Sequence, residues 1–170
     1  MKRILSIIMS LVMLLAASAS ALEVGLTDFT TTDMDGNTVT EEIFADYDLT
    51  MVNVWATWCG YCVDEMPDLA KLKDMLPENI NLITVCDDAD VEPELAQRIL
   101  QESGANFQTL KITEDMYNSL LAYVYSFPTT FFLDSRGVPV VQPIMGVPSL
   151  ENAAEAYYSI IQQVLEMMEG

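Results

Sequence analysis

Two cysteines separated by two residues mark the part of the sequence that could do chemistry. Cys59 and Cys62 lie in the stretch VWATWCGYCVDEMP, residues 54–67, which also holds both tryptophans. Such a pair can be a structural disulfide, half of a metal site or a reactive dithiol. The sequence has three cysteines and no histidine, which is too few ligands for a zinc site of the usual cysteine and histidine kind. We therefore assign no metal ligands and expect no cofactor.

The lack of histidine and the acidic composition limit the remaining function classes. Ser-His and Cys-His catalysis need an imidazole, and haem attachment through C-x-x-C-H needs a histidine where this sequence has Val63. There are 26 acidic and 7 basic residues, which give a formal net charge of −19. No segment is basic enough to follow a phosphate backbone, so we expect no nucleic-acid partner. The acids are spread along the chain and are interpreted as a solvated surface.

The first residues have the pattern of a secretory targeting segment. A short positive start is followed by an apolar run over residues 4–15 and by small residues that end at Ala21. This order is typical of a signal peptide with an A-x-A cleavage site. We predict a signal peptide over residues 1–21 and one mature domain over residues 22–170. The expected location is extracytoplasmic, secreted or in the cell envelope, and an uncleaved segment acting as a membrane anchor stays an alternative.

Export changes the interpretation of the cysteine pair. Paired cysteines outside the cytoplasm usually form structural disulfides. However, the loop between Cys59 and Cys62 is too short for a disulfide there to stabilise a fold much. The sequence is 51% hydrophobic over 170 residues, so it can bury a core without such help. The spacing favours redox chemistry, while a non-enzymatic exported binding domain with a structural disulfide remains an alternative.

The elements expected around the pair place Cys59 at the start of a helix. An apolar, β-rich run covers residues 49–57, and from Val63 to Met75 apolar residues recur every three to four positions. Unpaired N–H groups and the helix dipole at a helix N-terminus favour a thiolate over a thiol. We therefore predict a lowered pKa and the role of attacking nucleophile for Cys59. Cys62, one turn later, is predicted to resolve the mixed disulfide.

The rest of the pattern predicts an α/β sheet with helices on both faces. An N-terminal β-hairpin is expected over residues 22–40, around the turn dipeptide Asp35-Gly36. The other expected elements are a short helix at 41–46, strands at 79–86, 107–112, 129–134 and 138–145, and helices at 91–103, 114–123 and 149–168. Pro139 and Pro143 favour an edge position for the last strand. Ser149 is expected to cap the last helix, with Leu150 the first residue of its core-facing stripe.

Two motifs together resemble the thioredoxin superfamily. WATWCGYC followed by EMP, and the later FPTTFFLD, are most similar to the secreted or membrane-anchored TlpA-like thiol-disulfide oxidoreductases, over roughly residues 29–169. The resemblance implies a thioredoxin-like fold, in which helices flank a central mixed β-sheet with an N-terminal hairpin and a helical insertion. It also implies that Cys59 and Cys62 are the redox pair of a monomer. Exported protein thiols and disulfides would be its substrates, and a membrane thiol-electron carrier its electron partner.

The resemblance assigns a loop and a face to substrate binding. Pro128 matches the cis-proline that the family places beside its disulfide, and Phe127 would offer its backbone to an extended substrate segment. Trp58 is assigned to the substrate face. Gly60 and Tyr61, between the cysteines, shape the turn and help to set the reduction potential.

Glu65 is the candidate for proton transfer. It matches an acidic residue that TlpA-like proteins place near the inner cysteine, and it follows Cys62 by three residues, so the two share a helix face. Burial would raise its pKa and allow it to carry a proton to and from Cys62; an exposed acid on an acidic surface is the alternative. Thioredoxin has a buried aspartate where this sequence has Asn53, which cannot titrate.

Three questions stay open at this stage. Oxidants, reductants and isomerases all use C-x-x-C, so the direction of electron flow is not fixed, although a reductase is expected. A thiol peroxidase is the second enzymatic candidate, but the proline- and threonine-bearing loop of peroxiredoxins is missing. Cys86 ends a predicted strand and is either a buried free thiol or a third redox cysteine.

Overall fold

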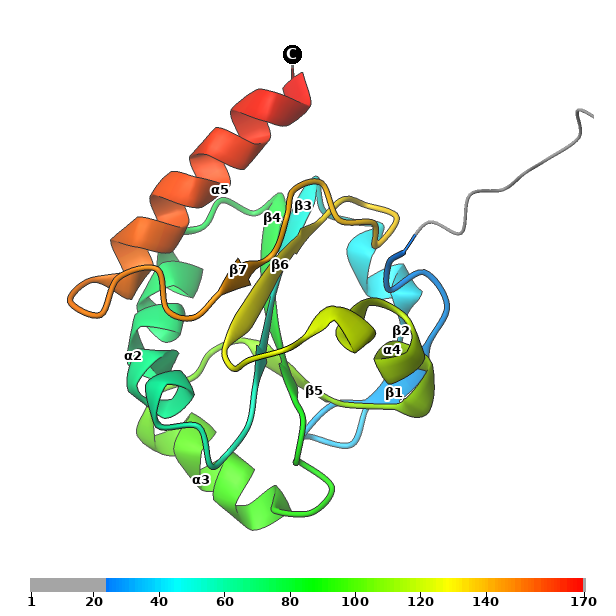
Figure 1. Cartoon of the computed structure of the whole chain (residues 1–170), viewed down its shortest axis with the longest axis vertical. Helices are drawn as coiled ribbons and strands as arrows, with labels where there is room; N and C mark the ends of the chain where they lie inside the picture. Colours follow the sequence, from blue (N-terminus) through cyan, green and yellow to red (C-terminus); the bar gives the residue numbers. More distant parts are fainter. Residues whose placement is uncertain (1–23, 170) are drawn as a thin grey trace, which may run out of the picture.

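A five-stranded mixed sheet forms the centre of the fold (Figure 1). The structure, a computed structural model, describes residues 24–169, and the predicted signal peptide lies outside them. Within the described residues no helix has the length and apolar character needed to cross a membrane. The strands are β3 (Leu49–Trp55), β4 (Ile80–Cys86), β5 (Gln108–Lys111), β6 (Thr129–Leu133) and β7 (Ile144–Met145), in the order β5-β4-β3-β6-β7. The strands β3, β4 and β5 are parallel, whereas β6 runs antiparallel to β3 and β7 antiparallel to β6.

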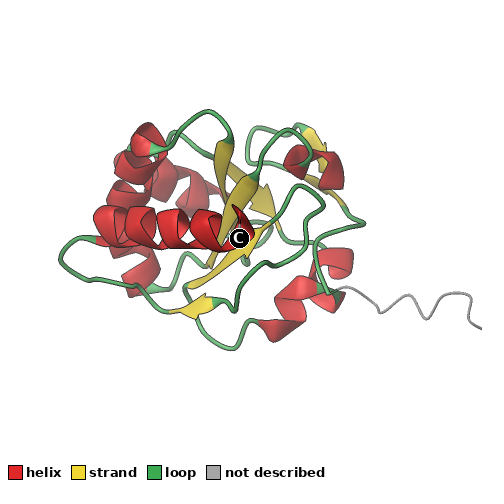
Figure 2. Cartoon of the chain, turned by 90° about the horizontal axis from the view of Figure 1, so that it is seen from above, coloured by secondary structure: helices red, strands yellow, loops and turns green. Residues whose placement is uncertain are grey.

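Helices cover both faces of this sheet, as Figures 1 and 2 show. One face carries α2 (Gly60–Met75), α3 (Pro93–Glu102) and α5 (Ala153–Glu169). The other carries a separate hairpin of β1 (Thr30–Thr32) and β2 (Thr38–Thr40), the 3-10 helices η1 (Glu41–Phe44) and η2 (Leu120–Tyr123), and α4 (Glu114–Asn118). The predicted α/β architecture and thioredoxin-like fold are confirmed.

The alternation of side chains along β3 explains which residues face the helices α2 and α5. Met51 and Trp55 pack into the core on the α2 side, and Val52 and Val54 pack into the core on the opposite side. Successive residues of a strand point to opposite faces of the sheet. Asn53 is therefore the polar residue that this central strand turns toward α2.

The predicted strand over residues 138–145 is mostly wrong. Only Ile144 and Met145 pair with β6, and one isolated bridge joins Leu133 to Pro139. Proline has no N–H group for a strand ladder, so Pro139 and Pro143 limit the pairing to this short segment. The predicted edge position is confirmed, because β7 ends the sheet.

The last helix begins later than predicted. It starts at Ala153, whose N–H donates to Asp68 Oδ2 on α2 at 3.2 Å, so the cap comes from another helix and not from Ser149. Leu150 precedes the helix and is 74% exposed, so its assignment to the core-facing stripe was wrong. The buried stripe consists of Ala153, Ala154, Tyr157, Ile161 and Val164. The predicted helix over 114–123 divides into α4 and η2 at Ser119.

Candidate active site

Cys59 and Cys62 form a disulfide at the N-terminus of α2. Cys59 is the N-cap residue, and its Sγ accepts a hydrogen bond from the Cys62 N–H at 3.2 Å. Cys62 is fully buried, whereas Cys59 keeps 7% of its surface exposed. An N–H group directed at a sulfur stabilises a thiolate more than a thiol. The predicted position of Cys59 at a helix N-terminus is confirmed, and Cys59 is the cysteine of the pair that keeps some contact with solvent.

Aromatic side chains lie beside the disulfide on the surface. Trp58 and Tyr61 are 68% and 63% exposed. The Trp58 ring packs edge-on against Phe127, with 5.5 Å between the ring centroids. This contact brings the loop that carries Phe127 and Pro128 next to the residue that precedes Cys59. The bond between Phe127 and Pro128 is cis, as predicted, and the Pro128 carbonyl accepts a hydrogen bond from Gly146 N–H at 2.8 Å.

Gly60 leaves the surface of the first turn of α2 open between the two cysteines. It is exposed, and apart from its chain neighbours and the local helix backbone no heavy atom lies within 4 Å of the position that a Cβ atom would take there. A partner chain can therefore approach the N-terminal turn of α2 closely at this residue.

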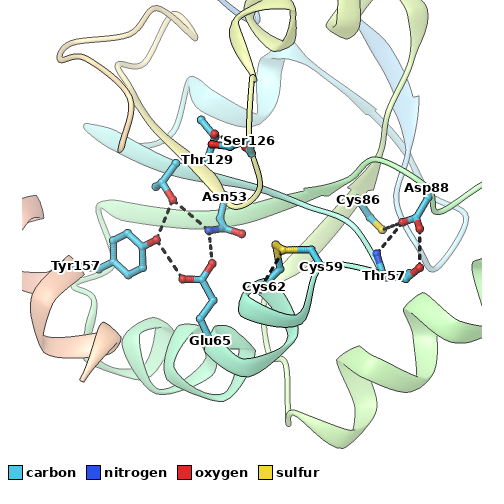
Figure 3. The surroundings of a disulfide bond; sticks show 11 residues. Asn53, Thr57, Cys59, Cys62, Glu65, Cys86, Asp88, Ser126, Thr129 and Tyr157 are labelled. Carbon is cyan, nitrogen blue, oxygen red and sulfur yellow. Dashed lines mark hydrogen bonds between the residues drawn. A yellow bond between two sulfur atoms is a disulfide. The ribbon is translucent and has the colours of Figure 1, made fainter. Parts of the chain in front are cut away.

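Glu65 is buried below the disulfide and not on the acidic surface (Figure 3). Its Oε1 accepts a hydrogen bond from Asn53 Nδ2 at 2.9 Å, and its Oε2 accepts one from the Tyr157 hydroxyl at 3.3 Å. Burial raises the pKa of Glu65 to about 7, and nearby Asp68 adds to this, while the two hydrogen bonds act in the opposite direction. A carboxyl group with this pKa can both take and release a proton near neutral pH.

The hydrogen bonds around Glu65 close into a ring that joins four elements. Asn53 Nδ2 on β3 also donates to Thr130 Oγ1 on β6 at 3.1 Å, and Thr130 Oγ1 lies 3.0 Å from the Tyr157 hydroxyl on α5. All three partners are buried. Tyr157 was not among the site residues predicted from the sequence. The one signal that could have marked it is its hydroxyl, because a buried tyrosine usually finds a hydrogen-bond partner.

A second polar cluster holds the segment that leads into the cysteine pair. Asp88 accepts hydrogen bonds from the Thr57 N–H at 2.9 Å and from the Thr57 hydroxyl. The same carboxylate accepts one from Cys86 Sγ at 3.4 Å. Cys86 is a free, fully buried cysteine, and its burial, together with Asp88, raises the pKa of its thiol strongly. A protonated, buried thiol is a poor nucleophile, which favours the interpretation of Cys86 as a structural residue.

This geometry agrees with the relationship that the sequence comparisons show. Residues 24–140, more than half of the chain, match the AhpC/TSA family. The chain belongs to the AhpC/TSA family. The matched residues include the cysteine pair at the start of α2 and the cis-proline loop beside it.

Relatives of this AhpC/TSA protein are named for thiol:disulfide interchange or for a likeness to thioredoxin. It is 34% identical over 104 residues to the thiol:disulfide interchange protein DsbE of Haemophilus influenzae, with 61% of this chain and 55% of that protein covered. It is 32% identical over 89 residues to the thioredoxin-like protein YneN of Bacillus subtilis, with 52% and 51% covered. The match thus spans about half the length of these relatives.

The fold extends the similarity over most of the domain. The crystal structure of a thiol:disulfide interchange protein of the thioredoxin family from Chlorobium tepidum superposes with a TM-score of 0.66. The superposition covers 83% of this chain and 98% of the Chlorobium tepidum chain, at 18% sequence identity. Together with the match to the thioredoxin-like AhpC/TSA family, this likeness of fold confirms the predicted membership of the thioredoxin superfamily.

Proposed function

We propose that this protein is an extracytoplasmic thiol-disulfide oxidoreductase that reduces disulfides in exported proteins through Cys59 and Cys62. The observation that carries the proposal is the asymmetry of the pair. Cys59 is the N-cap residue of α2 and keeps a little of its surface exposed, and Cys62 is fully buried on the helix face that carries Glu65. A structural disulfide needs neither this difference between its cysteines nor a buried acid with a pKa of about 7 on the same helix.

The reaction starts from the reduced protein. The Cys59 thiolate attacks one sulfur of a substrate disulfide, forms a mixed disulfide and releases the other substrate sulfur as a thiolate, which takes up a proton. Cys62 then loses its proton to the Glu65 carboxylate and attacks Cys59 Sγ. The Cys59–Cys62 bond forms, the bond to the substrate breaks, and the substrate leaves with its second sulfur reduced. Two electrons have moved from the pair to the substrate.

The surface around Cys59 suits an extended protein segment. Trp58, Tyr61 and Phe127 offer exposed or half-buried aromatic rings, which bury large areas at low cost in side-chain entropy. Gly60 gives close access to the helix terminus, and the loop at Phe127 and Pro128 lies beside it. We assign these five residues to substrate binding.

Location and electron supply complete the proposal. The signal-like first 21 residues support export, with residues 22–170 as the working domain. The oxidised pair must be reduced again after each turnover, and we assign this step to a thiol-electron carrier in the membrane. The protein is proposed to act as a monomer.

An insulin-reduction assay with dithiothreitol as electron donor tests the activity. We expect faster precipitation of the insulin chains with the protein than without it, and no acceleration with Cys59→Ser. Peroxide consumption, measured in parallel, tests the thiol peroxidase alternative; fast peroxide turnover without insulin reduction would contradict the proposal. The reduction potential then tests the direction, because a strongly negative value fits a reductase and a high value an oxidase.

A further inference from the structure

One buried oxygen beside the disulfide has no hydrogen-bond partner among the described residues. It is Asn53 Oδ1, and Thr50 Oγ1, on the same strand, is the other buried side-chain atom in this state within residues 24–169. Asn53 is completely buried. A buried carbonyl without a donor costs free energy, so its presence in a native structure calls for an explanation, of which a redox role is one.

The amide nitrogen of Asn53 fixes the orientation of the whole amide group. Both N–H bonds of Nδ2 are used, one to Glu65 Oε1 and one to Thr130 Oγ1. Turning the amide over would remove both of these donations, and with Glu65 ionised it would also set two acceptor oxygens against each other. The ring of hydrogen bonds therefore directs Oδ1 away from Glu65.

The free oxygen points toward the disulfide. Figure 3 shows the Asn53 carbonyl oxygen on the side of Cys59 and Cys62, opposite the nitrogen that contacts Glu65. Asn53 faces the same core layer as Cys62, which is fully buried. Thr84 is the residue paired with Asn53 where β3 lies beside β4. Its hydroxyl oxygen accepts a hydrogen bond from Trp55 Nε1 and is hydrogen-bonded to the Thr109 hydroxyl, so it gives Asn53 no donor.

We propose that Asn53 Oδ1 accepts a hydrogen bond from the Cys62 thiol once the disulfide is reduced. In the oxidised protein neither sulfur carries a proton, so the oxygen has nothing to accept. When a donor dithiol reduces the pair, the Cys59–Cys62 bond breaks and the two sulfurs together gain two electrons. The donor becomes a disulfide, and Cys62 takes one of its protons. This new S–H group lies in a buried site and meets the waiting oxygen.

Asn53 therefore acts as a positioning residue that sets the balance between disulfide and dithiol. Its oxygen lacks a donor in the oxidised state and gains one in the reduced state, so it favours the reduced protein. It also keeps the proton on Cys62 until the mixed disulfide has formed and Glu65 removes it. This inference rests on the proposed redox function of the pair and adds the group that tunes it.

The S–H stretching vibration of Cys62 gives a direct test. In a Cys59→Ser, Cys86→Ser background Cys62 is the sole thiol, and its infrared band moves to lower frequency when the thiol donates a hydrogen bond. We expect the band at the lower frequency in this background and a shift to higher frequency on adding Asn53→Leu. Adding Thr50→Val replaces the Thr50 hydroxyl, which also has no hydrogen-bond partner among the described residues, with a methyl group, and it should leave the band unchanged. A band that does not respond to Asn53→Leu would overturn the proposal.

The redox equilibrium gives the second readout. In the otherwise unchanged protein, Asn53→Leu should favour the disulfide in equilibrium with dithiothreitol by about threefold to tenfold, the size of one lost hydrogen bond. A tenfold change corresponds to a potential about 30 mV more negative. Asn53→Asp is a second variant that tests the proposal even if Asn53→Leu fails to fold. At mildly acidic pH its protonated carboxyl group can donate to Glu65 and keep an oxygen toward Cys62, so both band and equilibrium should stay close to the parent.

These outcomes are separate from those of the proposed function. The band and the equilibrium are measured on purified protein without a protein substrate, so failure to reduce insulin would leave them intact. An Asn53→Asp variant with a high-frequency band, or an Asn53→Leu variant whose equilibrium equals that of the parent, would contradict the role of Asn53 even in a fully active enzyme.

Discussion

Replacing Glu65 by glutamine should change how the stability of the oxidised protein depends on pH. Burial raises the pKa of Glu65 from 4.5 to about 7 in the folded protein. In the unfolded chain the carboxyl ionises near its ordinary pKa. Between these two values the folded state holds a proton that the unfolded state has lost, so stability falls as the pH rises. The contribution of protonated Glu65 is complete below pH 4.5 and is lost as the pH passes about 7.

The size of this effect follows from the two pKa values. At about 1.4 kcal/mol per pH unit, the interval corresponds to about 3 kcal/mol of stability lost between acid and neutral pH. Glutamine keeps the volume and cannot ionise, so it avoids this loss. The glutamine amide has one oxygen, so it can accept only one of the two hydrogen bonds that Asn53 and Tyr157 donate to Glu65. Its NH₂ group then faces the other donor, and the lost hydrogen bond costs about 1 kcal/mol of stability. We therefore expect Glu65→Gln to be about 2 kcal/mol more stable than the parent at about pH 8, and slightly less stable at about pH 4.

Urea unfolding of the oxidised protein at a series of pH values measures this difference. The free energy of unfolding of each variant is extrapolated to water, with equal slopes required for the comparison. Asp64→Asn is the matched control, because it removes an exposed carboxylate from the preceding position of α2. Its stability should follow the parent at every pH. A constant difference between Glu65→Gln and the parent across the range would refute the assignment of a raised pKa to Glu65.

Three further predictions concern the reactive sulfur, the ring of hydrogen bonds and the fold. Brief alkylation of the reduced protein at neutral pH should label Cys59 before the inner cysteine, and mass spectrometry of the peptides would show the reverse order if the assignment is wrong. Tyr157→Phe removes a hydrogen bond that lowers the pKa of Glu65, so the pH midpoint of the stability change should move upward; an unchanged midpoint would exclude this bond. Gly137 has a φ of 77°, and a Cβ there would lie 2.5 Å from the Leu26 carbonyl oxygen. Gly137→Ala should therefore destabilise the fold by at least about 1 kcal/mol in urea unfolding, and no loss would contradict this packing.

Local pattern was enough to predict the elements that position the cysteine pair. The buried run before Cys59 and the three-to-four periodicity after it define a strand and a helix whatever the distant contacts are. The burial of Glu65 follows from its spacing to Cys62 on one helix face, combined with the covered face of a central strand. The cis bond before Pro128 came from the resemblance and not from any local signal.

The partners of Glu65 could not be predicted, because they come from distant parts of the chain. Tyr157 is 92 positions away, and its place opposite Glu65 depends on how α5 packs on α2. The same packing explains why α5 starts at Ala153, since its cap comes from Asp68 on α2 and not from the adjacent Ser149. Periodicity gives the face of a helix, but not the residue that it meets on another helix.

Trapping of the mixed disulfide tests the central claim most directly. Reduced Cys62→Ser, mixed with a disulfide-containing protein such as insulin, should form a covalent complex that dithiothreitol dissolves, because Cys59 attacks and no resolving thiol follows. Peptide mapping should place the link on Cys59, and Cys59→Ser should form no complex under the same conditions. A link on Cys62 or Cys86, or no complex with Cys62→Ser, would contradict the account of Cys59 as the nucleophile of a thiol-disulfide oxidoreductase.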